Sequence, residues 1–193
     1  MFKNLANILT LLRIVCAFFF IWFVLKQTLF FNFLAMCIFI IAGISDYLDG
    51  FIARRTNAIS GFGKLLDPVA DKIFVLGAFI SFVRLSIVPV WVVVVIIFRE
   101  LLVTGLRVFA AYNGKLIPAE ISGKHKTAWQ MGVIFFILLW LLLDSVHYNN
   151  VKGFLQSYEW FFKGCVSILM FIVLVITLWS GWKFLWNNKE IIG

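Results

Sequence analysis

The fold is decided where two apolar segments meet a charged stretch, at residues 45–72, which read SDYLDGFIARRTNAISGFGKLLDPVADK. The residues on either side, 30–44 and 73–83, contain no charged side chain. A helix that crosses the hydrocarbon core of a bilayer needs about 20 predominantly apolar residues. The pattern therefore predicts two membrane-spanning helices joined by a short polar turn.

The rest of the chain has the same character. Of its 193 residues, 63% are apolar and 13% are charged, and its mean hydropathy is +1.03. A soluble domain is about half apolar and about a quarter charged, so these values exclude a soluble domain and a disordered chain. Backbone groups in lipid must hydrogen-bond internally, and the sequence lacks the short alternating strands of a barrel. The predicted fold class is therefore an all-α integral membrane protein.

Six apolar segments can be drawn within residues 1–193, with no internal repeat and no low-complexity linker. We therefore expect a single membrane domain of six transmembrane helices. The last segment carries no side chain to which we assign chemistry. The predicted spans are 5–25, 30–53, 66–84, 88–112, 126–146 and 158–186.

Basic residues predict the orientation of these spans. With the N-terminus inside, 13 of the 17 Lys and Arg residues fall on the inner side, which is the side that positive charge favours. Both termini and the segments around 54–64 and 113–126 are therefore predicted to be cytoplasmic. The formal net charge of +8 lies between apolar runs, which favours anionic membrane lipid and phosphate-bearing substrates as partners over nucleic acid.

Two stripes of polar and small residues flank the turn. On a helix, residues at i, i+3, i+4 and i+7 share one face. Each stripe carries two carboxylates and two small residues, and Pro68 is expected in the first turn of the third helix. The stripes are Asp46, Asp49, Gly50 and Ala53 on the second span, and Gly63, Asp67, Ala70 and Asp71 on the third.

Helices joined by so short a turn are expected to be antiparallel neighbours, which would bring the four carboxylates together. Anions this close repel one another in a low-dielectric setting, and divalent cations relieve that repulsion. Oxygen ligands without His or Cys favour Mg²⁺ or Mn²⁺, and a pair of such ions about 3.5–4 Å apart assists phosphoryl transfer. The alternative is structural: the small residues pack helices, and the acids pair with Arg54 and Lys72.

These stripes match the signature of the CDP-alcohol phosphatidyltransferases, D-x2-D-G-x2-A-R-x8-G-x3-D-x3-D, and the chain resembles that family. The resemblance implies a six-helix fold, a homodimer and two divalent metal ions, Mg²⁺ or Mn²⁺, bound by Asp46, Asp49, Asp67 and Asp71. It also implies that Asp71 is the general base. The implied CDP-binding residues are Asn7, Asp49, Gly50, Ala53, Arg54, Gly63 and Asp67.

The N-terminal segment carries a weaker likeness to the same family. Asn7, Thr10 and Arg13 form N-x2-T-x2-R, which is similar to the family's P-N-x-L-T-x2-R opening with Ala6 in place of proline. Helix capping is the alternative role for Asn7 and Thr10.

Two further motifs bear on the acceptor alcohol. Residues 99–107 read RELLVTGLR, and residues 123–127 read GKHKT. Arginine suits bidentate phosphate contact and lysine supplies a point charge. Two alternatives stay open: Glu100 neutralises Arg107, or the basic run is only a topology signal. The candidate phosphate-binding residues are Arg99, Thr104, Arg107, Lys124 and Lys126.

Both motifs resemble the phosphatidylglycerophosphate synthase branch of the family. That branch implies transfer of phosphatidyl from CDP-diacylglycerol to sn-glycerol 3-phosphate with release of CMP, in a bacterial inner membrane with the active site facing the cytoplasm. Inositol phosphate or phosphatidylglycerol is the alternative acceptor. A cation channel or transporter is the alternative from another class, but a pore needs charges along its length and these Asp residues cluster at one depth.

Overall fold

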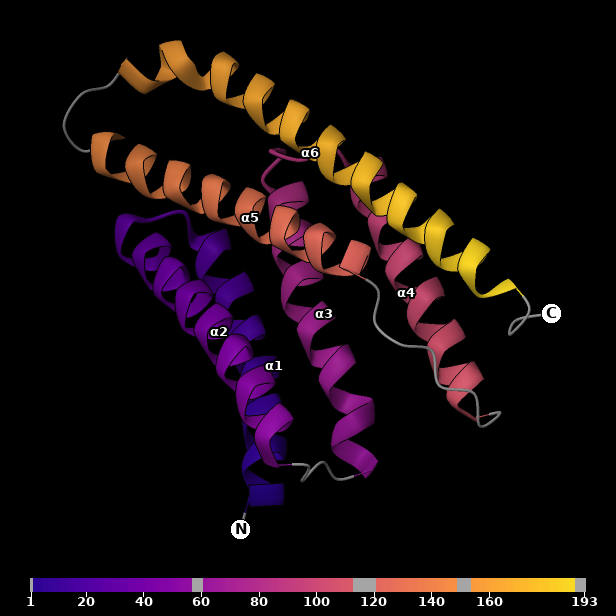
Figure 1. Cartoon of the computed structure of the whole chain (residues 1–193). Coiled ribbons are helices and arrows are strands. Elements are labelled where there is room, and N and C mark those ends of the chain that lie inside the picture. Colours follow the sequence, from indigo (N-terminus) through magenta and orange to yellow (C-terminus); the bar gives the residue numbers. More distant parts are fainter. Residues whose placement is uncertain (1, 57–60, 113–120, 149–153, 190–193) are drawn as a thin grey trace.

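A computed structural model describes the backbone of residues 2–56, 61–112, 121–148 and 154–189. Within these ranges it describes the side chains of residues 12–45, 72–112, 123, 125–146 and 158–189. This described part is helical and contains no strand (Figure 1). The helices are α1 (Phe2–Lys26), α2 (Leu29–Thr56), α3 (Gly61–Arg84), α4 (Val90–Tyr112), α5 (Ile121–Tyr148) and α6 (Phe154–Asn187).

Each of the six predicted segments corresponds to a helix, which confirms that part of the prediction, although α4 begins at Val90, two residues after the predicted start of the fourth span. The position of Pro68 is a correction: α3 begins at Gly61, which places Pro68 in the second turn and not in the first. The predicted third span began at residue 66 because an apolar window marks the residues that suit lipid. A helix needs only its backbone hydrogen bonds, and so it continues past that window into a more polar sequence.

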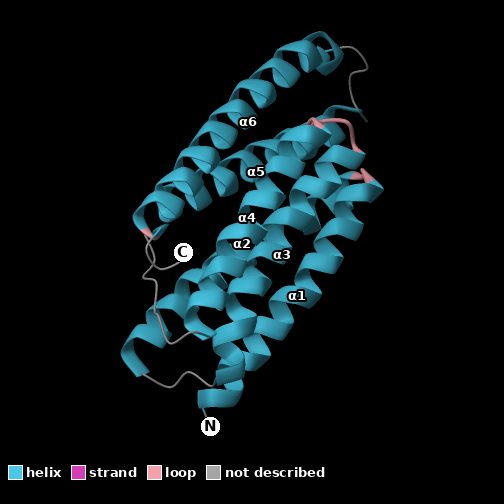
Figure 2. Ribbon diagram, turned by 90° about the vertical axis from the view of Figure 1, so that its right-hand side faces the viewer, coloured by secondary structure: helices cyan, strands magenta, loops and turns pink. Residues whose placement is uncertain are grey.

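Two tight turns reverse the chain. Gln27 has a φ of 49°, and the next residue, Thr28, caps α2 by accepting a hydrogen bond at its Oγ1 from the Phe31 amide at 3.5 Å. After α3, Ser86 has a φ of 57°, and the Ile87 amide donates to the Phe82 carbonyl at 3.0 Å. These turns lie at the same end of the molecule, opposite the N-terminus (Figure 2).

The helix packing leaves a space between α2 and α3. Helix α1 packs against both α2 and α3, and α5 also contacts both, while α6 packs on α4 and α5. Gly77 of α3 allows a close approach to α1, because a Cβ atom there would lie 2.8 Å from Ile21 Cδ1. Helices α2 and α3 are antiparallel, as expected (Figure 1). Gly43 of α2 and Phe74 of α3 both line a cavity, to which α1, α4 and α5 also contribute side chains.

The outer surface is apolar. Phe98 and Leu101 of α4, with Ile168 and Phe171 of α6, are each at least 62% exposed. A surface of this kind is unfavourable in water and suits contact with lipid chains. By length and composition, two helical stretches of the described residues are able to cross a membrane, His125–Val146 and Tyr158–Asn187, and Leu29–Ser45 is a shorter apolar stretch.

Candidate active site

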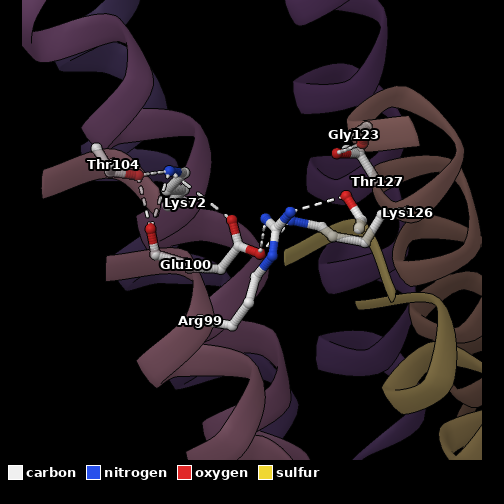
Figure 3. Close-up of polar contacts among 8 residues, drawn as sticks. Lys72, Arg99, Glu100, Thr104, Gly123, Lys126 and Thr127 are labelled. Atoms are coloured by element: carbon white, nitrogen blue, oxygen red, sulfur yellow. Dashed lines mark hydrogen bonds and ion pairs between the residues drawn. The ribbon is translucent and has the colours of Figure 1, made fainter. Parts of the chain in front are cut away.

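A buried carboxylate organises the polar centre of the bundle. Glu100 of α4 is only 4% exposed. Its Oε1 accepts from Lys126 Nζ of α5 and lies 3.2 Å from Arg99 Nη1, while its Oε2 lies 3.7 Å from Lys72 Nζ of α3 (Figure 3). A buried charge without partners is costly, so three cations around one carboxylate form a mutually dependent group. We call Lys72, Arg99, Glu100 and Lys126 the Glu100 cluster.

Lys72 also ties α3 to α4 through uncharged groups. Its Nζ donates to Thr104 Oγ1 and to the Glu100 backbone carbonyl, the latter at 3.4 Å. Thr104 Oγ1 in turn donates to that same carbonyl at 2.7 Å. Lys72 directly follows Asp71, the last Asp of the motif. Its side-chain bonds therefore link α3 to α4 next to that residue.

Helix α6 holds the two arginines of α4. Arg99 Nη2 donates to Ser180 Oγ at 2.8 Å, and a Cβ atom at Gly181 would lie 3.1 Å from Arg99 Cγ. The Arg107 guanidinium lies 5.3 Å from the centre of the Phe184 ring, which is a cation–π contact. The last helix, to which the sequence assigned no chemistry, therefore contacts both side chains.

The cavity between α2 and α3 has a volume of about 380 Å³ and lies beside the Glu100 cluster. Small-molecule sites start at about 300 Å³. Among the described residues that line it, four are basic and one is acidic, so the cavity favours an anion. Those charged residues are Arg13, Lys72, Arg107, Lys126 and Glu100.

The structure places four of the five predicted phosphate-binding residues in or beside this cavity. Arg107 and Lys126 line it. Arg99 is held behind Glu100, and Thr104 is engaged with Lys72. Lys124 lies on α5, and its side chain is outside the described residues. Their role in binding phosphate stays a prediction.

Sequence reasoning did not assign Lys72, Glu100, Gln130 or Arg13 to the site. Glu100 carries the one carboxylate of α4, and an ionisable group within an apolar helix is itself a signal of function. Gln130 follows Lys126 by four residues and therefore shares its face of α5. Arg13 ends the N-x2-T-x2-R motif, and it lines the cavity.

The carboxylate stripes lie on the two helices that border the cavity. Asp46 and Asp49 belong to α2, and Asp67 and Asp71 belong to α3. Among the described side chains, no group of three or more His, Cys, Asp or Glu residues gathers. The metal and CDP sites therefore stay predictions, because the side chains of Asn7, Asp46, Asp49, Gly50, Ala53, Arg54, Gly63, Asp67 and Asp71 lie outside the described part.

Comparison with known proteins gives matches over most of the chain. A family model described as CDP-alcohol phosphatidyltransferase matches residues 3–186. The chain is 36% identical over 153 residues to a CDP-diacylglycerol–glycerol-3-phosphate 3-phosphatidyltransferase of Bacillus subtilis, covering 79% of this chain and 72% of that protein. Proteins with the same name match from Rickettsia bellii, at 30% identity over 94% of this chain and 93% of the relative, and from Wigglesworthia glossinidia brevipalpis, at 33% over 96% and 98%.

The family match spans nearly the whole chain and includes both helices that carry the carboxylate stripes, so the chain belongs to the CDP-alcohol phosphatidyltransferase family.

Proposed function

We propose that the protein transfers the phosphatidyl group of CDP-diacylglycerol to sn-glycerol 3-phosphate and releases CMP, as its relatives' name describes. The observation that carries the choice of acceptor is the cavity, where four basic side chains and one carboxylate give a net positive lining. A phosphate dianion in a partly desolvated site needs more than one cation. Serine has no phosphate to match this lining.

The reaction is an attack by a hydroxyl oxygen on phosphorus. The terminal hydroxyl of glycerol 3-phosphate attacks the phosphorus that bears diacylglycerol, and its proton passes to the Asp71 carboxylate. The bond between that phosphorus and the oxygen bridging to CMP breaks, so CMP leaves and a phosphodiester remains. Asp71 acts as general base, and the other groups hold the reactants in line.

The helical repeat supports placing the carboxylates at the mouth of the cavity. Gly43 lines the cavity from α2, and Asp46 follows it by three residues. Phe74 lines it from α3, and Asp71 precedes it by three residues. Residues three apart share a helix face. Each carboxylate stripe thus continues a cavity wall toward the helix ends that are joined by residues 57–60.

Asp46, Asp49, Asp67 and Asp71 form the proposed metal site. Four carboxylates are a donor set that suits Mg²⁺ or Mn²⁺. Two such ions, when bound, would neutralise charge on the pyrophosphate of the donor. The small residues of the same stripes leave space for the nucleotide beside the backbone. The proposed CDP contacts are those that the signature implies: Asn7, Asp49, Gly50, Ala53, Arg54, Gly63 and Asp67.

Arg107 and Lys126 bind the acceptor phosphate in this proposal, with Lys124 near the end of the same helix. Arg99 and Thr104 have a positioning role. Arg99 pairs with the same Glu100 carboxylate as Lys126, and the Thr104 hydroxyl accepts a hydrogen bond from Lys72. The cations are therefore in place before phosphate arrives, which lowers the reorganisation that binding requires.

The same proposal places the protein in the bacterial inner membrane as a six-span homodimer, with both termini and the active site on the cytoplasmic side and anionic lipid around it. The exposed apolar side chains of α4 and α6 support several spans. The basic bias of the sequence supports the orientation.

The function is tested by incubating the purified protein with CDP-diacylglycerol and a panel of alcohols. We expect CMP release with sn-glycerol 3-phosphate and much slower release with inositol phosphate, phosphatidylglycerol or serine. A preference for inositol phosphate would overturn the choice of acceptor but leave the family intact. No CMP release with any alcohol would overturn the proposed reaction.

Metal dependence is tested by chelation. We expect excess EDTA to abolish CMP release and added Mg²⁺ or Mn²⁺ to restore it, because four clustered carboxylates need cations to hold a pyrophosphate. Ca²⁺ serves as a control for simple charge neutralisation. Turnover that continues unchanged in excess chelator would contradict the proposed metal site.

The general base is tested by Asp71→Asn, which keeps the size of the side chain and removes its basicity. We expect kcat to fall by roughly 10²–10⁴-fold while binding of the donor is largely retained. Asp144→Asn is the matched control, since Asp144 lies on α5, is exposed and does not line the cavity. Near-normal turnover by the Asp71 variant would show that another group accepts the proton.

The phosphate contact is tested by Lys126→Met, which keeps length and removes charge. Losing one charge-assisted contact costs about 1.5–3 kcal/mol, so the KM for glycerol 3-phosphate should rise about tenfold to hundredfold. The KM for CDP-diacylglycerol should change far less. Lys183→Met is the control, because Lys183 is an exposed lysine of α6 outside the cavity. A larger rise in the donor KM would assign Lys126 to the pyrophosphate.

A further inference from the structure

Gln130 is a polar side chain of the cavity that the proposed reaction leaves without a role. It lies on α5, is 2% exposed, and lines the cavity together with Lys126. Within the described part of the chain, its Nε2 has no hydrogen-bond partner. A buried amide left unpaired is unfavourable by about 1–3 kcal/mol, so a group at this position is expected to find its partner in what the cavity holds.

The chemistry of the amide indicates the kind of partner. A glutamine side chain is neutral and offers two donors and one acceptor, which suits a hydroxyl group that both donates and accepts. The phosphate already has cations nearby, since Arg107 and Lys126 line the same cavity. A neutral amide adds little to phosphate binding there, but it distinguishes a ligand that has a hydroxyl from one that lacks it.

The position of Gln130 agrees with this chemistry. It follows Lys126 by four residues, which is about 6 Å along a helix and comparable with the length of a three-carbon phosphate ester. Three of the side chains that line the cavity with it are apolar: Met131 of α5 and Val75 and Leu76 of α3. Thr127, three residues before Gln130, also lines the cavity, but it is exposed and its hydroxyl donates to the Gly123 carbonyl at 3.2 Å. Among the described residues that line the cavity, the buried neutral amide with an unpaired donor is therefore that of Gln130.

Building on the proposed function, we propose that Gln130 determines acceptor specificity by hydrogen-bonding the C2 hydroxyl of sn-glycerol 3-phosphate. The terminal hydroxyl must reach the phosphorus of the donor and give up its proton, so a fixed bond to an amide would compete with attack. The C2 hydroxyl takes no part in bond making. It is the remaining neutral polar group of the acceptor, and the Gln130 amide is a buried neutral group of the cavity whose Nε2 has no partner among the described residues.

The test compares two acceptors on two enzymes. 3-Hydroxypropyl phosphate keeps the phosphate and the attacking hydroxyl of glycerol 3-phosphate and lacks only the C2 hydroxyl. For the wild-type protein we expect kcat/KM to be about tenfold higher with glycerol 3-phosphate than with this analogue. In Gln130→Met, which keeps the length of the side chain, that ratio should fall to about one because only the hydroxylated acceptor loses a contact.

Thr177→Val is the matched control. Thr177 Oγ1 of α6 is also buried without a hydrogen-bond partner among the described residues, but Thr177 does not line the cavity. Its variant should keep the wild-type ratio, whereas a general effect of removing a buried polar group would lower the ratio in both variants. The KM for CDP-diacylglycerol should be unchanged in Gln130→Met, and a rise there would overturn the proposal by assigning Gln130 to the donor.

Two further outcomes overturn the inference. One is a ratio near one in the wild-type protein, which needs no variant and so does not depend on whether Gln130→Met folds. The other is a Gln130→Met enzyme that keeps the tenfold ratio. Failure of the proposed function is distinguishable from both, because the wild-type protein would then release no CMP with either acceptor.

Discussion

The burial of one carboxylate is the constraint on which the centre of this bundle depends. Glu100 is almost fully enclosed, and its partners Lys72 and Lys126 come from the helices on either side of α4 in the chain, α3 and α5. Removing one partner from a buried ion pair typically destabilises a protein by about 3–5 kcal/mol. The packing of α3, α4 and α5 in the folded state therefore depends on these side chains being paired, and Arg99 extends the group to Ser180 of α6.

A buried ion pair is weak evidence for stability, because apolar residues of similar volume often serve as well. The Glu100 cluster lies at the wall of the cavity, which indicates a role in ligand binding rather than in stability alone. Lys126 and Lys72 line the cavity while the Glu100 carboxylate holds their ammonium groups, so the positive charge is oriented before any ligand binds. An anion that enters meets cations whose side-chain entropy has already been lost, and this favours binding and correct placement.

The sequence predicted the helices well because long apolar runs in lipid have one satisfactory backbone structure. It predicted the site less completely. Helical spacing shows which residues share a face of one helix, so Arg107 and Lys126 were found, and both line the cavity. Spacing does not show which faces of different helices meet. The pairing of Lys72 with Glu100 and the close packing of Arg99 on Gly181 are contacts between different helices, so spacing along one helix does not predict them.

The start of α3 illustrates a second limit. Polar residues can extend a helix without adding to its apolar signal. The predicted third helix therefore began too late, and Pro68 was expected in the first turn of α3 although it lies in the second. The space between α2 and α3 was missed for a related reason. A short connection predicts neighbouring helices, but here α1 and α5 contact both of them, and a cavity bordered by Ala42 and Gly43 lies between.

The proposed reaction gives different tasks to different walls of this cavity. The family signature lies on α2 and α3, and its carboxylates and small residues suit the nucleotide pyrophosphate that every donor of this class carries. The cations and the amide that face the cavity from α4 and α5 lie outside the signature: Arg107, Lys126 and Gln130. If these side chains bind the acceptor as proposed, a change of acceptor requires changes on α4 and α5, together with the α6 residues that contact them, and leaves the signature intact. This division is the physical reason that the signature alone does not name the alcohol.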